Sequence, residues 1–171
     1  GLKGIEVHNC TGDVIINNNN VTNNSTSADG IGIRVYSISD NLTIKGNTVN
    51  GGNRGIEIQY CACNISMDNN QVSGQSKQSV RFIDCGTNKK IFFYTHGYGA
   101  LKISTANGNY SITAVPSVGY QFKAYYKEND LINLVSTNQT EKVAINWSGD
   151  AYRRHPLFVE CEHSYKTTTQ K

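Results

Sequence analysis

The sequence predicts an all-β protein in which a solenoid of stacked coils is followed by antiparallel strands. The first observation is an internal repeat: Gly4-Ile5-Glu6-Val7-His8 recurs as Gly30-Ile31-Gly32-Ile33-Arg34, as Gly55-Ile56-Glu57-Ile58-Gln59 and, more weakly, as Ser79-Val80-Arg81-Phe82-Ile83. The second is that apolar and polar residues alternate in each copy, which is the period of a strand. A repeat of about 25 residues built from short strands is typical of a solenoid.

Each copy of the repeat is followed by a second apolar motif, over residues 14–21, 42–49 and 65–72. Coils that stack at about 4.8 Å place equivalent side chains above one another, so the inward residues should form ladders. We expect the ladders to contain Ile5/Val7, Ile31/Ile33, Ile56/Ile58 and Val80/Phe82; Val14/Ile16, Leu42/Ile44 and Ile65/Met67; and Val21, Val49 and Val72.

An asparagine stands at the same place in three successive coils, as Asn19, Asn47 and Asn70. Stacked amides can satisfy one another and the backbone of the turn, because each amide both donates and accepts. The alternative is a chance alignment in an asparagine-rich chain. Agreement with the flanking apolar positions favours a true ladder.

The composition changes after Cys85, where the repeat stops and aromatic residues become frequent. Short strands at a spacing of about 8 to 12 residues, with local turns between them, predict an antiparallel sandwich-like sheet. Asn107-Gly108 is a hairpin signal within this region. The expected strands cover residues 90–95, 100–105, 110–115, 120–127, 131–136, 142–147 and 157–161.

These patterns divide the chain into three parts: coils over residues 1–86, an antiparallel capping and trimerisation domain over 87–163, and a polar tail over 164–171. A cap is expected because the last coil of a solenoid exposes apolar ladders and unpaired backbone groups. The chain begins directly on a strand motif, so we expect it to be the C-terminal piece of a longer protein. A short solenoid has a limited core, which favours oligomerisation.

Composition limits the classes of partner. Hydrophobic residues make up 37% of the chain, and no apolar run is long enough to span a membrane. The net charge of +3 is not gathered into a basic stripe, so nucleic acid is not an expected partner. His96, His155 and His163 lack metal-ligand spacing, and no motif indicates a cofactor. We expect Arg153-Arg154-His155 to form a charged loop.

The pattern Gly-Ile-x-Ile followed by Ile-x-x-Asn-x-Val resembles the right-handed parallel β-helix of the pectate-lyase-like superfamily over the first half of the chain. The resemblance implies about three to four coils. The superfamily includes polysaccharide lyases and hydrolases as well as bacteriophage tailspike and tail-appendage proteins, and the fold alone does not choose among these activities.

The layout most resembles the C-terminal part of a phage tailspike. That resemblance implies a virion-tail protein that recognises host cell-surface polysaccharide, with a full-length form that degrades it and a fragment that caps and trimerises. The alternatives are a secreted bacterial lyase or glycoside hydrolase of the same fold and a noncatalytic glycan-binding adhesin.

Outward residues of the first strand of each coil form the candidate site. One expected row contains Glu6, Gly32, Glu57 and Arg81, and the next contains His8, Arg34, Gln59 and Ile83. Glu6 and Glu57 are two coils apart, near the carboxylate separation of inverting glycoside hydrolases, and are the candidate catalytic acid and base. Gly32 would leave room for a sugar between them.

Arg34, Arg81, His8 and Gln59 are the candidate substrate-binding residues, since a guanidinium binds a carboxylate through two hydrogen bonds. The competing interpretation is that these are solvated residues of a strand face, with Arg34 pairing across coils to Glu6 or Glu57.

Five cysteines, Cys10, Cys61, Cys63, Cys85 and Cys161, make an odd number without zinc spacing. Cys61 and Cys85 fall on adjacent coils, where a disulfide is conceivable, but reduced core thiols are the favoured interpretation.

Overall fold

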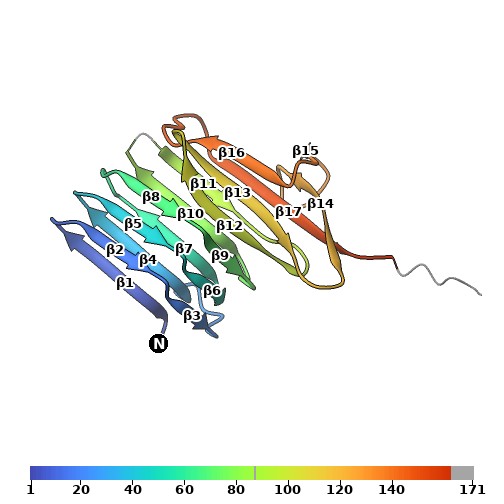
Figure 1. Cartoon of the computed structure of the whole chain (residues 1–171), viewed down its shortest axis with the longest axis horizontal. Coiled ribbons are helices and arrows are strands. Elements are labelled where there is room, and N and C mark those ends of the chain that lie inside the picture. The colour runs from blue at the N-terminus through green and yellow to red at the C-terminus, as the bar shows by residue number, and fades with distance from the viewer. Residues whose placement is uncertain (87, 163–171) are drawn as a thin grey trace, which may run out of the picture.

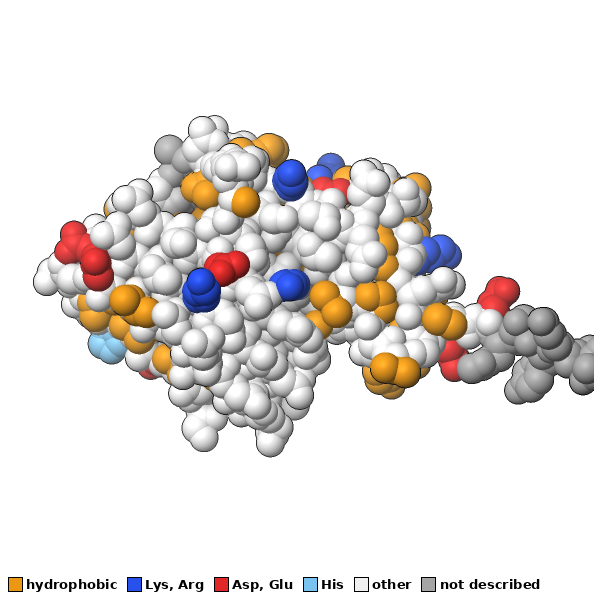
Figure 2. All heavy atoms as spheres, in the orientation of Figure 1, with side chains coloured by type: hydrophobic (Ala, Val, Ile, Leu, Met, Phe, Trp, Pro, Cys, Tyr) orange, Lys and Arg blue, Asp and Glu red, His pale blue; other side chains and the backbone are white. Residues whose placement is uncertain are grey.

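The computed structural model of the protein describes residues 1–86 and 88–162. This part of the chain contains seventeen β-strands and no helix, which confirms the all-β prediction. The strands form three sheets. Figure 1 shows the strands of the first half stacked as coils, with longer strands of the second half continuing from the last coil. On the same face, Figure 2 shows charged side chains at separate places and not gathered into one patch.

Each of the first three coils contributes one strand to each of three sheets, β10 begins a fourth coil in the first sheet, and the strands of the coils pair in parallel. The first sheet contains β1 (Lys3–Cys10), β4 (Ile31–Ile38), β7 (Arg54–Gln59) and β10 (Gln78–Cys85). The second contains β2 (Val14–Asn17), β5 (Leu42–Lys45) and β8 (Ile65–Asp68). The third contains β3 (Asn20–Asn23), β6 (Thr48–Gly51) and β9 (Asn70–Ser73). The predicted solenoid is therefore present, with about three turns.

The ladders of the second and third sheets have the predicted members. Val14, Leu42 and Ile65 stand in one column, Ile16, Ile44 and Met67 in the next, and Val21, Val49 and Val72 in the third sheet. Their side chains are buried, apart from the half-buried Ile65.

In the first sheet, the predicted register was wrong in the second coil. Ile5 pairs with Ile33, and Val7 pairs with Val35, whereas Ile31 pairs with Lys3. The second coil therefore sits two residues further along than expected. The same shift places Ile33, and not Ile31, beside Ile56 of the third coil. Between the third and fourth coils the predicted partners are correct, since Ile56 pairs with Val80 and Ile58 with Phe82.

The cause of the error is a doubled motif, because Gly30-Ile31 and Gly32-Ile33 both match the start of the repeat. The structure selects Gly32 as the equivalent of Gly4 and Gly55. At each of these three glycines a Cβ atom would collide with a valine of the third sheet, Val21, Val49 or Val72. The loop between β3 and β4 absorbs the two additional residues.

The asparagine ladder is confirmed. Asn19 Nδ2 donates to Asn47 Oδ1, and Asn47 Nδ2 donates to Asn70 Oδ1, both at 2.9 Å. Asn47 and Asn70 also donate to the backbone carbonyls of Ile16 and Ile44 in the neighbouring coil. The buried amides are thus satisfied by equivalent residues above and below.

The second half contributes seven strands: β11 (Asn88–Phe93), β12 (Gly99–Ala106), β13 (Asn109–Pro116), β14 (Tyr120–Tyr126), β15 (Leu134–Ser136), β16 (Thr140–Ala144) and β17 (Tyr152–Glu160). The hairpin at Asn107-Gly108 is confirmed, since β12 pairs with β13 across it and both turn residues have positive φ. The main difference from the prediction is β17, which begins at Tyr152 rather than at residue 157. The run Arg153-Arg154-His155, expected as a loop, is therefore part of a strand.

The added strands extend two sheets of the solenoid. β11 pairs antiparallel with β10, which gives an eight-stranded sheet in the order β1-β4-β7-β10-β11-β17-β14-β15. β12 pairs antiparallel with β9, which gives a six-stranded sheet in the order β16-β13-β12-β9-β6-β3. The expected division at residues 86 and 87 thus falls between two paired strands of one sheet. Residues 163–171, which include the expected tail and His163, lie outside the described residues.

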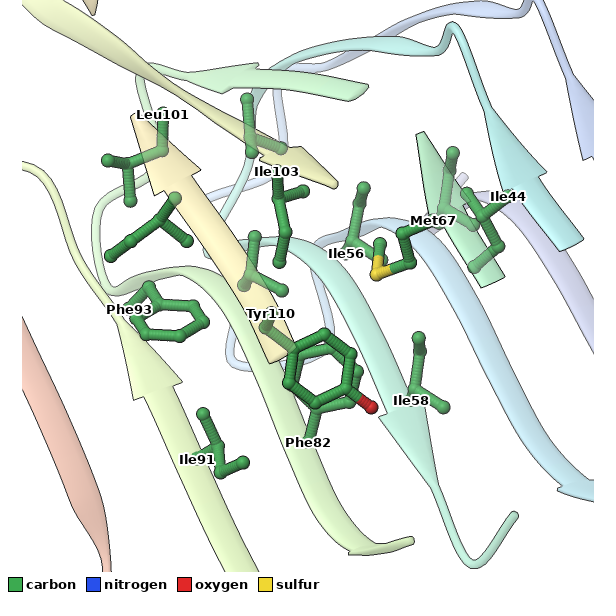
Figure 3. Packing of buried hydrophobic residues seen from close by; sticks show 14 of the residues in the cluster. Ile44, Ile56, Ile58, Met67, Phe82, Ile91, Phe93, Leu101, Ile103 and Tyr110 are labelled. Carbon is green, nitrogen blue, oxygen red and sulfur yellow. The ribbon is translucent and has the colours of Figure 1, made fainter. Parts of the chain in front are cut away.

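One hydrophobic cluster runs through both halves of the chain. Figure 3 shows Ile56, Ile58 and Phe82 of the coils packed with Phe93, Leu101, Ile103 and Tyr110 of the added strands. The rings of Phe82 and Tyr110 lie 4.4 Å apart. The last coil is therefore covered by continuous packing, which removes the exposed end that a solenoid would otherwise present.

Candidate functional site

The candidate residues lie on the outward side of the eight-stranded sheet. Glu6 pairs with Arg34, Arg34 with Glu57, and Glu57 with Arg81, on β1, β4, β7 and β10. Directly paired residues of a sheet point to the same face. We call these four residues the charged row.

Ion pairs connect the whole charged row. Arg34 Nη1 donates to Glu6 Oε1 at 3.0 Å, and Arg34 Nε lies 3.4 Å from Glu57 Oε1. On the other side, the Nε atoms of Arg54 and Arg81 each lie 3.4 Å from Glu57 Oε2. Burial lowers the pKa of the Arg81 guanidinium, and the negative charge of Glu57 opposes that change. The interpretation that Arg34 pairs across coils with both carboxylates is therefore confirmed.

The two carboxylates of the row differ in exposure. The Glu57 side chain is 1% exposed, covered by three guanidinium groups, whereas the Glu6 side chain is 32% exposed. In this arrangement Glu57 has no surface open to a sugar, while Glu6 does. The catalytic roles of Glu6 and Glu57 stay predictions.

The expected space between Glu6 and Glu57 is absent. Because the second coil is shifted by two residues, Arg34 and not Gly32 stands between the two glutamates. Arg34 moves from the expected second row into the charged row. Its expected place beside His8 and Gln59 is occupied by Tyr36.

A ring platform borders the charged row on β1 and β4. The rings of His8 and Tyr36 stack with centroids 4.9 Å apart and an interplanar angle of 7°. Arg34 Cζ lies 4.8 Å from the Tyr36 ring centroid. Gln59 continues this second row on β7, followed by Ile83 on β10. The structure thus brings all six candidate residues onto one face, although in a different order from the prediction.

The row continues onto the added strands. Arg81 pairs with Phe92 on β11, and Phe92 pairs with Arg153 on β17. The Cζ atoms of Arg81 and Arg153 lie 5.8 and 5.4 Å from the Phe92 ring centroid. Two cations therefore share one aromatic ring at the junction between the coils and the added strands.

A cleft of about 530 Å³ opens at this junction, with Arg153 in its wall. Its other lining residues include His96, which follows β11, and His155 of β17. His96 Nε2 and His155 Nδ1 are 2.8 Å apart, and the Tyr94 ring stacks on His155 with centroids 3.9 Å apart. Burial lowers the pKa of both imidazoles, that of His155 to about 4, where the neighbouring His96 and Arg153 add to the effect.

His96 and His155 were not among the site residues predicted from the sequence. His96 and His155 are 59 residues apart and lack metal-ligand spacing. One signal was present: in both Tyr94-Thr95-His96 and Arg153-Arg154-His155 the first and third residues share a face if the segment is extended. Assignment of the second segment to a loop hid that signal.

The cysteines are all free thiols in this structure. Cys61 and Cys85 are buried at the same end of adjacent coils, and contact with Cys85 lowers the pKa of Cys61 to about 7. Burial raises the pKa of Cys63 to about 11. Within residues 1–86 and 88–162, no group of three or more histidine, cysteine, aspartate or glutamate side chains is placed to hold a metal ion.

Comparison with known families matches residues 1–114 to the family described as right handed beta helix region. The chain belongs to this family. The match runs past the coils and into β13, in agreement with sheets that continue from one half to the other. Neither the curated proteins nor the solved structures contain a significant match to the chain. The fold is compatible with polysaccharide-binding or pectate-lyase-like proteins. In the described residues no helix is long and apolar enough to cross a membrane.

Proposed function

We propose that this chain recognises an acidic cell-surface polysaccharide through the outward face of the eight-stranded sheet. The observation that carries the proposal is the excess of positive charge at the charged row. Its two carboxylates, Glu6 and Glu57, form ion pairs with four cations: Arg34 and Arg81 of the row and the neighbouring Lys3 and Arg54. The surplus of positive charge favours an anionic ligand, and guanidinium groups match a carboxylate in geometry.

The stacked rings of His8 and Tyr36 support the same proposal. They present flat faces beside the cations, and an aromatic face suits the apolar face of a sugar ring. A saccharide lying across β1, β4 and β7 would contact both the ring platform and the exposed parts of the arginines.

Recognition is favoured over cleavage by the burial of Glu57. Hydrolysis of a glycosidic bond by two carboxylates requires that both reach the bond or its water. Glu57 is instead enclosed by Arg34, Arg54 and Arg81. A polysaccharide lyase or glycoside hydrolase of the same family is the alternative function, and a noncatalytic adhesin outside a virion is the second alternative.

The biological context that we propose is a phage tailspike or tail-appendage protein, of which this chain forms the C-terminal part. The layout supports it: coils are followed by aromatic-rich antiparallel strands that cover the last coil. In this context the full-length protein would act at the virion tail as a depolymerase, and the second half would hold three chains together.

Exposed apolar residues near one edge of the eight-stranded sheet support the proposed homotrimer. Ile132, Leu134 and Val135 are exposed next to or within β15, which ends that sheet. Exposed apolar residues at a sheet edge favour association. Light scattering at micromolar concentration should give three times the mass of one chain, and a monomer would contradict the trimer.

The binding proposal is tested with an acidic oligosaccharide and its neutral counterpart. The probes are a hexamer of galacturonic acid and its fully methyl-esterified form, which keeps the sugars but removes the charge. Isothermal titration should show binding of the acid form, and Arg34→Gln or Arg81→Gln should weaken it about tenfold or more, as expected when a charge-assisted hydrogen bond is lost.

Lys102→Gln is the matched control, because Lys102 is exposed on β12 of the other sheet. Equal affinity for the acid and the ester, or an equal loss in the control, would contradict recognition by the charged row. Cleavage of the hexamer that disappears in folded Glu57→Gln would instead support the enzyme alternative.

A further inference from the structure

The cleft at the junction of the two halves has the features of a separate binding site. Lys77 lies before β10, Tyr94 and His96 follow β11, Glu128 follows β14, and Arg153 and His155 belong to β17. Four separate segments of the chain therefore meet around one cavity. The cleft exists only because the added strands pair with the coils.

The histidine pair is held in a fixed position. The His155 side chain is buried, with a residue exposure of 2%, and is fixed by the hydrogen bond to His96 and by the stacked ring of Tyr94. Backbone bonds join the strands on both sides of the pair, from His96 N to Pro156 O and from Phe158 N to His96 O. The two imidazoles are therefore positioned before any ligand arrives.

Counting protons shows what this pair can offer. Both imidazoles are neutral at pH 7, because burial lowers both pKa values, that of His155 to about 4. Two neutral rings carry two N–H protons, and the bond between His96 Nε2 and His155 Nδ1 uses one of them. The remaining proton sits on His96 Nδ1 or on His155 Nε2. The pair thus has one donor and one acceptor left for a ligand, whichever tautomer is present.

Cations stand beside this neutral pair. Arg153 rests on the Phe92 ring and Lys77 is exposed, and neither makes a salt bridge within the described part of the chain. The adjacent Arg154 differs, since its Nε lies 3.6 Å from Glu141 Oε2. Glu128 is the carboxylate of the lining. The cleft therefore combines two cations that form no salt bridge with the described residues, one anion, and neutral groups that both donate and accept.

We propose that this cleft is a second saccharide-binding site that takes one acidic sugar unit. Lys77 and Arg153 bind its carboxylate, and the His96–His155 pair and Glu128 bind its hydroxyl groups, each of which both donates and accepts a hydrogen bond. The inference rests on the proposed function and extends it, because Arg81, Phe92 and Arg153 connect the charged row to the cleft.

The test uses the whole chain with the hexamer of galacturonic acid and its methyl ester. Lys77→Gln changes an exposed residue and should leave the fold intact, and it should weaken binding of the acid form about tenfold. His96→Gln should weaken it as well. Lys102→Gln again serves as the charge-matched control and should bind like the unmodified protein.

A second measurement reports on the cleft alone. The ring nitrogen signals of His96 and His155, followed by NMR, should shift when the acidic hexamer is added and should not shift with the ester. They should still shift in the doubly substituted Arg34→Gln, Arg81→Gln protein, at a higher ligand concentration, because that protein keeps the cleft.

The possible failures are distinguishable. Binding that needs Arg34 and Arg81 but is unchanged in Lys77→Gln and His96→Gln, with no movement of the ring signals, would overturn the cleft site and leave the proposed function in place. Binding that needs only the cleft residues would support the cleft and contradict the charged row. Absence of any binding would overturn both.

Discussion

The coils and the added strands share two sheets and one core, yet they are built by opposite rules. In the coils, parallel pairing places like residues together, as in the Val21, Val49 and Val72 column. In the added strands, antiparallel pairing brings unlike residues together, such as Tyr125 with Pro156 and Tyr126 with His155. Repetition makes the first kind of register visible in a sequence, and the second kind leaves no such trace.

The halves also differ in how they satisfy buried polar groups. The coils bury Asn47, Asn70 and Glu57 in columns where the partners come from equivalent strands. The added strands bury single groups with individual partners, such as the His96–His155 pair, or without one, as at Tyr110 Oη. Stability should therefore respond differently to polar substitutions in the two halves.

The largest effect is expected at Glu57. Glu57→Gln removes the buried carboxylate that forms ion pairs with Arg34, Arg54 and Arg81, which should lower the free energy of unfolding by about 3 to 5 kcal/mol. Urea unfolding measures this. Glu6→Gln, at a partly exposed pair, should cost less than about 1 kcal/mol. Equal losses in the free energy of unfolding at the two sites would show that burial of Glu57 does not strengthen its ion pairs.

A pH-dependent effect is expected in the added strands. The pKa of His155 is about 4 in the folded protein against about 6.5 for a solvent-exposed imidazole, so the unfolded chain binds more protons between these values. Stability should therefore be fully present above pH 6.5 and decrease as pH falls towards 4, by up to about 3 kcal/mol from this group.

Unfolding at pH 7 and pH 4 tests this prediction when the protein is compared with His155→Gln, which cannot take up the proton. The unmodified protein should lose more stability over this range than the variant. The same loss in both would contradict a lowered pKa at His155.

The asparagine ladder should show an intermediate effect. Asn47→Ala removes the amide that donates to Ile16 O and to Asn70 Oδ1 and that accepts from Asn19, so three hydrogen bonds of the ladder are lost. The expected loss is about 2 to 3 kcal/mol in the free energy of unfolding. Asn24→Ala, at an exposed position of the neighbouring loop, should change it by less than about 0.5 kcal/mol. Equal free energies of unfolding for Asn47→Ala and Asn24→Ala would show that the ladder does not stabilise the fold.

The smallest effect has opposite signs at two buried tyrosines of the added strands. Tyr110 Oη is buried without a hydrogen-bond partner in the described residues, so Tyr110→Phe should stabilise the protein by about 1 kcal/mol. Tyr125 Oη donates to Gln139 O at 2.8 Å, so Tyr125→Phe should destabilise it by about 1 kcal/mol. Thermal unfolding of both variants tests the two predicted signs. A destabilised Tyr110→Phe protein would mean that the Tyr110 hydroxyl has a hydrogen-bond partner.

The fold of the coils could be predicted from the sequence because the same side chains recur at the same places. Asn19, Asn47 and Asn70 identified their own column without knowledge of the structure. The register failed only in the second coil, where Gly30-Ile31 and Gly32-Ile33 fit the repeat equally well. Packing of Val49 against Gly32 decides between them, and that contact is not visible in a list of residues.

The candidate site was predictable in part. All six predicted residues do share a face, since outward positions of stacked strands must align. The predicted positions of Arg34 and Gly32 in the two rows were wrong because of the register error in the second coil. The pairing of His96 with His155 could not be predicted from the sequence, because it depends on β11 lying beside β17. Five other strands separate β11 from β17 along the chain.

The most direct test of the account is to map where the acidic hexamer binds, by changes in backbone amide NMR signals of the whole chain. Changes are expected over β1, β4, β7 and β10 and around Arg153, with β2, β5 and β8 unaffected. Changes confined to the sheet of β2, β5 and β8, or an identical map with the methyl ester, would contradict recognition of an acidic polysaccharide by the outward face of the eight-stranded sheet.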